Sequence, residues 1–121
     1  MDLLGWIIAA RYIAGATVAA IGLVFVAGGG VGMLRFPDVY TRAHAALASD
    51  GVGATLVLLG LAIVASDPQV STRLILLSML TAAIAPFNVH AVASAAHAGG
   101  LAPLSGAYVA PRPGAKPAQA P

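Results

Sequence analysis

Three long apolar stretches follow one another along the chain, and short polar segments separate them. The first, from Tyr12 to Leu34, holds 23 residues without a charge. At 1.5 Å of rise per residue such a helix measures about 34 Å, enough to cross the roughly 30 Å hydrocarbon core of a bilayer. The third stretch runs from Leu74 to Ala98 after the break SDPQVSTR. Both stretches are predicted to be transmembrane helices, over residues 12–34 and 74–98.

The second apolar stretch is short, because only 16 residues lie between Asp50 and Asp67. As a helix they would span about 24 Å, less than a bilayer crossing needs. Since backbone in lipid must satisfy its own hydrogen bonds, we expect the helix to begin upstream and to cover residues 43–66. Asp50 would then lie about 12 Å inside the membrane. The alternative is a helix that starts after Asp50 in a thinned bilayer.

The composition agrees with a membrane protein. The 121 residues are 60% hydrophobic and 8% charged, whereas an ordinary soluble domain is about 25% charged. A soluble fold of this size could not hide so much apolar surface. We therefore predict an all-α membrane protein with three transmembrane helices. Residues 101–121 are rich in Pro, Ala and Gly, which predicts a disordered or extended C-terminal tail.

Several classes of function find no support in the sequence. Six basic residues against four acidic ones form no basic patch, so we expect membrane lipid and no nucleic acid as a partner. No arrangement of nucleophile and base points to an enzyme. The three histidines, at 44, 90 and 97, lie at different predicted depths and favour no metal site. We expect no cofactor.

Charged residues gather in the loop between the first two predicted helices. Pro37 cannot continue a helix, and Asp38 or Thr41 can cap the next one.

Basic residues on this side and in the tail outnumber those on the other side, which predicts a cytoplasmic C-terminus and an outside N-terminus. The motif of this loop comprises Arg35, Pro37, Asp38, Arg42 and His44, and the basic residues compared are Arg35, Arg42, Arg112 and Lys116 against Arg11 and Arg73.

Polar groups inside the predicted spans are candidates for ion handling. An acid such as Asp50 costs about 2.5–3.5 kcal/mol at a helix centre, and is expected to be neutral or to have a partner. His90 lies about 12 Å from the end of the third span, at the same predicted depth as Asp50. The two are hypothesised to share a protonatable layer; alternatively, His90 bonds a carbonyl of a neighbouring subunit. Pro86 breaks or kinks that span, and a plain kink is the commoner outcome.

Glycines in the first predicted span suggest a packing contact. Gly28 and Gly32 stand four residues apart, so they lie on one helix face. Small residues at this spacing let another helix approach closely.

The stretch GVGMLRFPDVYTRAHAALASDGVGATLVLLGLAI resembles the MrpG/MnhG/PhaG family, whose members are small subunits of the Mrp-type multisubunit sodium/proton antiporters. A second stretch, IAPFNVHAVASAAHAGG, resembles the motif of that family's third span. Together the two motifs cover about residues 20 to 100. The positions that match in the first motif are Gly32, Arg35, Phe36, Pro37, Asp38, Tyr40, Arg42, His44 and Ala45.

The resemblance implies an accessory subunit that helps to assemble a bacterial antiporter of Na⁺ and H⁺ and contributes to the cation path. Its partners would be other subunits, especially the small subunits E and F. The family often has Lys where Ala48 stands and Arg where Ser94 stands, which directs attention to Asp50 and Asn88 instead. Two rival functions remain: a purely structural assembly subunit, and a homo-oligomeric transporter that works alone.

Overall fold

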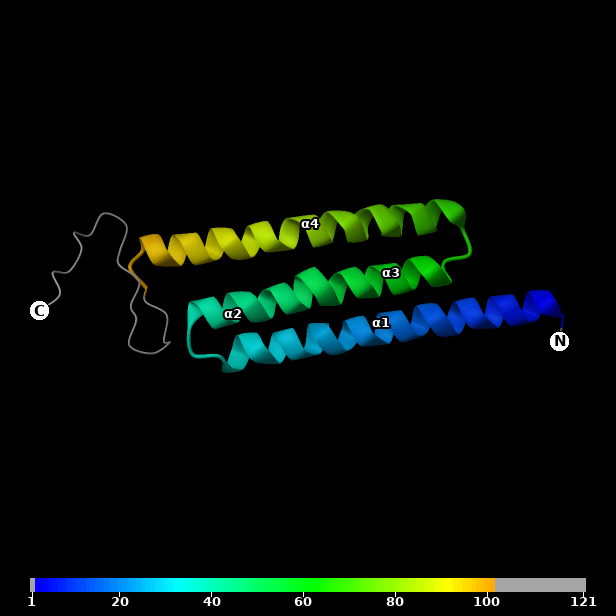
Figure 1. The fold of residues 1–121 in the computed structure, drawn as a ribbon, viewed down its shortest axis with the longest axis horizontal. Helices are drawn as coiled ribbons and strands as arrows, with labels where there is room; N and C mark the ends of the chain where they lie inside the picture. The colour runs from blue at the N-terminus through cyan, green and yellow to red at the C-terminus, as the bar shows by residue number, and fades with distance from the viewer. Residues whose placement is uncertain (1, 102–121) are drawn as a thin grey trace, which may run out of the picture.

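The chain folds into three long antiparallel helices, and the second of them is built from three segments (Figure 1). A computed structural model describes residues 2–101. The segments are α1 (Leu3–Arg35), α2 (Val39–Ala46), the π-helix η1 (Leu47–Ala54), α3 (Thr55–Val64) and α4 (Pro68–Ala98). All three long helices have the length and apolar composition to cross a membrane. The predicted all-α membrane fold with three transmembrane helices is confirmed.

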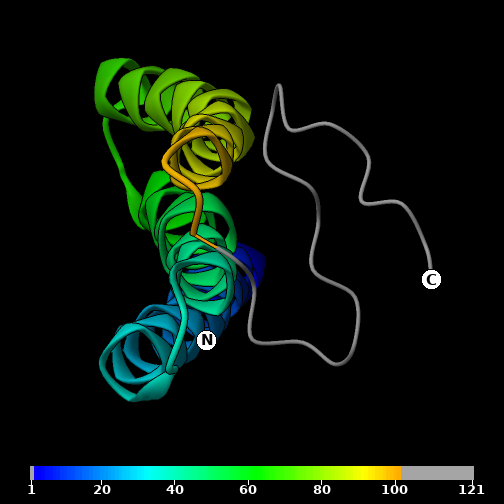
Figure 2. The same ribbon diagram turned by 90° about the vertical axis from the view of Figure 1, so that its left-hand side faces the viewer.

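The helices lie in a row and do not form a closed bundle. Viewed along their axes, the continuous helix of α2, η1 and α3 lies between α1 and α4 (Figure 2). It packs against both, whereas α1 and α4 do not contact each other. Only 11% to 22% of the residues in the apolar windows of the three helices are buried. The remaining surface must be covered by lipid or by other proteins, because its side chains are apolar.

Close packing of α1 against α3 and η1 depends on glycines at intervals of seven residues. Gly15 lies against Gly60, and Gly22 lies against Gly53. A Cβ atom on Gly22 would lie 2.7 Å from the carbonyl oxygen of Gly53, so the two backbones touch directly. This seven-residue repeat on antiparallel helices is typical of a left-handed crossing. We call this row of contacts the glycine seam.

Of the two glycines predicted to pack against another helix, only Gly32 does so within the described chain, and packing of Gly28 against a helix stays a prediction. A Cβ atom on Gly32 would lie 2.9 Å from that of Ala45, but one on Gly28 would meet nothing within 4 Å. The contact falls to Gly29, which lies against Ser49. Gly28 is one residue, or about 100°, away from the glycine seam.

Capping residues explain why the second and third helices begin earlier than the predicted residues 43 and 74. The Asp38 carboxylate accepts a hydrogen bond of 2.7 Å from the Thr41 N–H, as predicted for an N-cap, and it also contacts the Thr41 hydroxyl. Asp67 accepts one of 2.9 Å from the Gln69 N–H. Both caps satisfy N–H groups at a helix start, so the helices extend through the polar residues that flank the apolar stretches.

The ends of the predicted spans differ less from the structure than their starts do. The first helix begins at Leu3 instead of residue 12, and ends at Arg35, one residue beyond the prediction. The second ends at Val64, two residues early, and the third ends at Ala98 as predicted. Leu101 is the last residue described, so the predicted tail lies outside the described residues.

Candidate functional site

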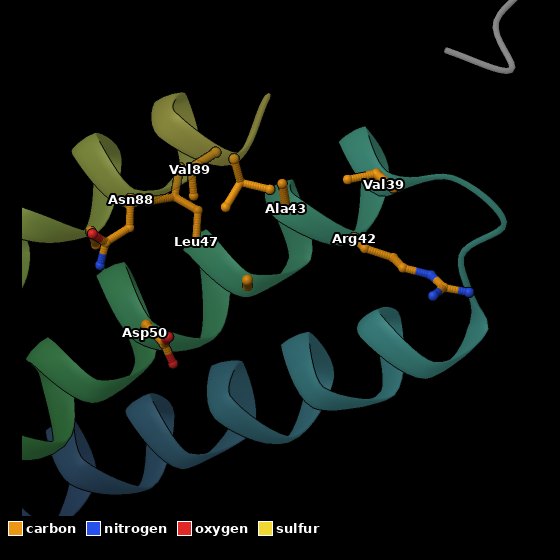
Figure 3. Close-up of a pocket in the computed structure, with 10 residues that line it drawn as sticks. Val39, Arg42, Ala43, Leu47, Asp50, Asn88 and Val89 are labelled. Carbon is orange, nitrogen blue, oxygen red and sulfur yellow. The ribbon is translucent and has the colours of Figure 1, made fainter. Parts of the chain in front are cut away.

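A cavity of about 270 Å³ lies between α4 and the α2–η1 part of the second helix (Figure 3). Most of its lining is apolar. Asp50 comes from η1 and Asn88 from α4, and both lie at the end of the cavity away from Arg42. The lining residues are Val39, Arg42, Ala43, Ala46, Leu47, Asp50, Ala85, Asn88, Val89 and Val92. We call this space the Asp50 cavity.

A second hollow, of about 310 Å³, adjoins the same two polar residues. Asp50 and Asn88 line it together with Thr81. The Thr81 hydroxyl donates to the carbonyl oxygen of Leu77 over 2.9 Å, so its own oxygen lone pairs remain available. A carboxylate, an amide and a hydroxyl therefore lie around two neighbouring hollows that share Asp50, Ala85 and Asn88. Sequence reasoning missed Thr81, although it lies seven residues before Asn88 and hence on the same helix face.

The π-helix positions Asp50. Hydrogen bonds in a π-helix join residues five apart, which gives a wider turn than in an α-helix. Two glycines follow Asp50 closely: a Cβ atom on Gly51 would lie 3.1 Å from that of Ala85 on α4, and one on Gly53 would lie 2.8 Å from the Val26 N on α1. The wider turn is thus held between both neighbouring helices. Such segments occur often at functional sites.

Asp50 lies deep within the second helix, which begins upstream of it as predicted. It stands 11 residues after Val39 and 14 before Val64, or about 16 Å and 21 Å from the two ends. Asn88 stands about 15 Å from the end of α4 at Ala98, and this end of α4 lies at the same end of the molecule as the start of α2 (Figure 1). The two residues therefore lie at a similar depth, about 15 Å below the end of the molecule where α2 begins and α4 ends.

The side chain of Asp50 has no hydrogen-bond or ion-pair partner within residues 2–101. It is exposed on the surface of the isolated chain. Arg42 does not pair with it, because the Arg42 side chain points toward the turn after α1 and its Nε donates to the carbonyl oxygen of Phe36 over 2.8 Å. A carboxyl group at this depth without a partner is available for an ion or for a group of another protein.

The structure does not bring His90 to Asp50. His90 is exposed and lines neither of the two hollows. It lies two residues after Asn88, so it shares the depth of the cavity but faces about 200° away around α4. Asp50 and His90 therefore line no common hollow described here, and Asn88 lies opposite η1 instead. That Asp50 and His90 share a protonatable layer stays a prediction.

Pro86 lies inside α4, which continues through it without interruption. Proline removes one backbone hydrogen bond and leaves the carbonyl of Ala82 without its usual donor. The nearby hydroxyls do not replace that donor: Ser78 donates to the carbonyl of Ile75 and Thr81 to that of Leu77. Ala82, Pro86 and His90 are spaced four residues apart and are all exposed, so the Ala82 carbonyl and the His90 ring lie on one face of α4.

The loop motif braces the end of the bundle near Arg35. Pro37 lies in the turn and Asp38 caps α2. The Arg42 side chain donates a hydrogen bond to the backbone carbonyl of Phe36, just before Pro37. The Tyr40 hydroxyl donates to the carbonyl oxygen of Leu101 over 2.8 Å, which ties the second helix to the end of the third. Arg35 and His44 are exposed and take no part in this bracing.

No group of three His, Cys, Asp or Glu side chains that could hold a metal ion occurs within the described part of the chain. The Asp50 cavity thus offers single oxygen donors at one depth and does not offer a preformed cluster of ligands.

Comparison with known proteins identifies the family. A sequence profile of the PhaG/MnhG/YufB family, described as a Na⁺/H⁺ antiporter subunit, matches residues 18–97. The chain belongs to this family. Residues 18–97 include the loop motif, the π-helix and the Asp50 cavity, so the resemblance seen in the two sequence motifs is confirmed.

The names of two curated relatives of this antiporter subunit do not state a function. A UPF0091 protein of Pyrococcus horikoshii is 41% identical over 75 residues, which cover 62% of this chain and 73% of that protein. A UPF0091 protein of Rickettsia conorii is 37% identical over 84 residues, which cover 69% of this chain and 79% of that protein.

A solved structure supports the same family. A chain in the Mrp complex from Dietzia sp. DQ12-45-1b matches with a TM-score of 0.75 and 25% identity, over 88% of this chain and 92% of that chain. Together with the family match and the three long apolar helices, this makes the chain a multi-pass membrane subunit in ion transport.

Proposed function

We propose that this accessory subunit of a multisubunit Na⁺/H⁺ antiporter contributes the Asp50 cavity to the path of the exchanged cations. The single observation that carries the proposal is a carboxyl group near mid-span without a partner in the described chain, next to Asn88 and Thr81. Acids at this depth are costly and mark ion or proton pathways in membrane proteins.

Oxygen donors of this kind suit hard cations. Asp50 supplies two carboxylate oxygens, Asn88 an amide oxygen and Thr81 a hydroxyl oxygen. The set is incomplete as a cation site, and the cavity is open on the surface of the isolated chain. We propose that other subunits supply further ligands, with the small subunits E and F as the expected neighbours.

The proposed orientation follows from the loop and tail charges. Arg35 and Arg42 lie at the end of the molecule where α1 ends, α2 begins and α4 ends, and the positive-inside rule favours the cytoplasm for this end. Arg112 and Lys116, which the prediction also counted, lie outside the described residues. We propose that this end, with the C-terminus, faces the cytoplasm of a bacterial cell membrane.

A matched pair of variants on α4 tests the ion-path proposal. Asn88→Ala removes a donor from the Asp50 cavity, whereas His90→Ala removes a polar side chain of the same depth that lies off the cavity. In the intact complex, reconstituted in proteoliposomes, Asn88→Ala should slow sodium-dependent proton exchange about tenfold. His90→Ala should leave the rate within twofold of the native one.

Two outcomes would overturn the proposal. If both variants assemble and exchange ions at the native rate, the chain is a structural assembly subunit. If this chain alone catalyses exchange in liposomes, it is a transporter in its own right; we expect no exchange from the chain alone.

A further inference from the structure

A separate hollow of about 280 Å³ lies between α1 and the first part of the second helix, on residues of α1, α2 and η1. Its walls include Val24, Phe25, Phe36 and His44, and Gly28 lies at its floor. We call it the Gly28 hollow. It is far larger than the roughly 30 Å³ that one water occupies in the liquid. Because its lining is mostly apolar, water gains little there, and an empty hollow forfeits dispersion contacts.

Gly28 leaves the backbone of α1 bare at the floor of this hollow. A Cβ atom on Gly28 would have no neighbour within 4 Å, unlike the glycines of the glycine seam. A bare backbone of this kind lets a second helix approach closely in a membrane. Within residues 2–101 no helix takes that position.

The same face of α1 ends in a positive charge. Positions 24, 28, 31 and 35 recur at helical spacing, so Val24, Gly28, Val31 and Arg35 line one stripe, and all four are exposed. Arg35 has no hydrogen-bond or ion-pair partner in the described chain, and neither has His44 on the wall of the hollow. A molecule that covers this stripe therefore needs a bulky apolar group to fill the hollow. It also needs an anionic group for Arg35, which lies about 10 Å from Gly28 along the axis of α1.

We propose that a transmembrane helix of another antiporter subunit docks on this stripe. It places a bulky apolar side chain in the Gly28 hollow, a hydrogen-bonding side chain beside His44, and a carboxylate near Arg35. This inference rests on the proposed assembly with other subunits, but not on the role of the Asp50 cavity. A lipid chain also fills the hollow, and its phosphate also suits Arg35, but a lipid does not need the bare backbone of Gly28, which favours a protein helix.

Glycine substitutions on α1 provide a matched test in the whole complex. Gly28→Leu fills the hollow, whereas Gly30→Leu places the same side chain two residues away, at a position whose Cβ also meets nothing within 4 Å. Gly28→Leu should reduce the other subunits that co-purify with this chain at least tenfold. Gly30→Leu should reduce them less than twofold. Equal recovery of the complex with both variants would overturn the proposal.

Cross-linking identifies the occupant without relying on assembly or transport. The chain contains no cysteine, so Gly28→Cys introduces a single thiol that takes a maleimide photo-cross-linker in the assembled complex. The expected product is an adduct between this chain and a different subunit, with no such adduct from Gly30→Cys. An adduct with lipid alone, or one with twice the mass of this chain, would overturn the proposal.

Discussion

The glycine seam makes a quantitative prediction at Gly60. A Cβ atom added there would lie 2.5 Å from the backbone N of Ala19 and 2.6 Å from the carbonyl oxygen of Gly15. Both atoms belong to the backbone of α1 and cannot rotate away. The Gly60→Ala variant can therefore be accommodated only if the two helices move apart.

The size of the effect follows from the cost of overpacking. One extra methyl group in a well-packed interior costs about 1–3 kcal/mol, which corresponds to about a 5- to 140-fold change in the unfolding equilibrium constant. Gly28→Ala is the matched control, because it gains the same helix propensity without a contact within 4 Å. The two variants should thus differ in free energy of unfolding by about 1–3 kcal/mol.

A single buried thiol can report this difference. Ser49 is 5% exposed and lies against Gly29 of α1, so Ser49→Cys reacts with a maleimide only when the helices separate. The rate of labelling, measured in micelles with increasing SDS, gives the free energy of separation for each variant. If Gly60→Ala and Gly28→Ala are labelled at the same rate, the close backbone contact does not hold the helices together.

Two further predictions concern the loop motif. Asp38→Ala should destabilise the start of α2 by about 0.5–2 kcal/mol because the Thr41 N–H loses its acceptor, whereas Asp38→Asn should retain most of the cap. Hydrogen exchange of the Thr41 amide distinguishes the two variants. Equal protection of that amide in both would contradict the capping role. Tyr40→Phe should lower stability by about 0.5–1.5 kcal/mol because the hydrogen bond to the Leu101 carbonyl is lost. Thermal unfolding in detergent measures this change. An unchanged midpoint would mean that this hydrogen bond does not hold the end of α4.

Much of the fold follows from the sequence because the bilayer sets a minimum helix length. Sixteen apolar residues after Asp50 cannot cross alone, and this one constraint placed the helix start upstream of Asp50, where the structure has it. The N-cap at Asp38 was also predictable from the sequence, because Asp is a preferred residue at the start of a helix. The first helix begins at Leu3 because a helix continues through Arg11, whose side chain reaches Ser66 across the bundle.

The arrangement around the site was less predictable. Gly51 and Gly53 beside Asp50 were a signal for irregular backbone, but nothing local distinguishes a π-helix from an α-helix, because the choice depends on contacts with α1 and α4. A single extra residue in a turn rotates everything that follows it. Asp50 and His90 were predicted to lie together from their depth in the membrane alone. The direction of each side chain around α4 also matters, and it places Asn88 at the cavity.

The most direct measurement of the central claim is occupancy of Asp50 by the transported ion. An apolar carbodiimide reacts with carboxyl groups inside the bilayer, and Asp50 is the one acid within the predicted spans; Asp50→Asn controls for other sites. In the intact complex, sodium should slow labelling of Asp50, whereas potassium at the same concentration should not. Labelling at the same rate with and without sodium would contradict the claim that cations pass this carboxyl group.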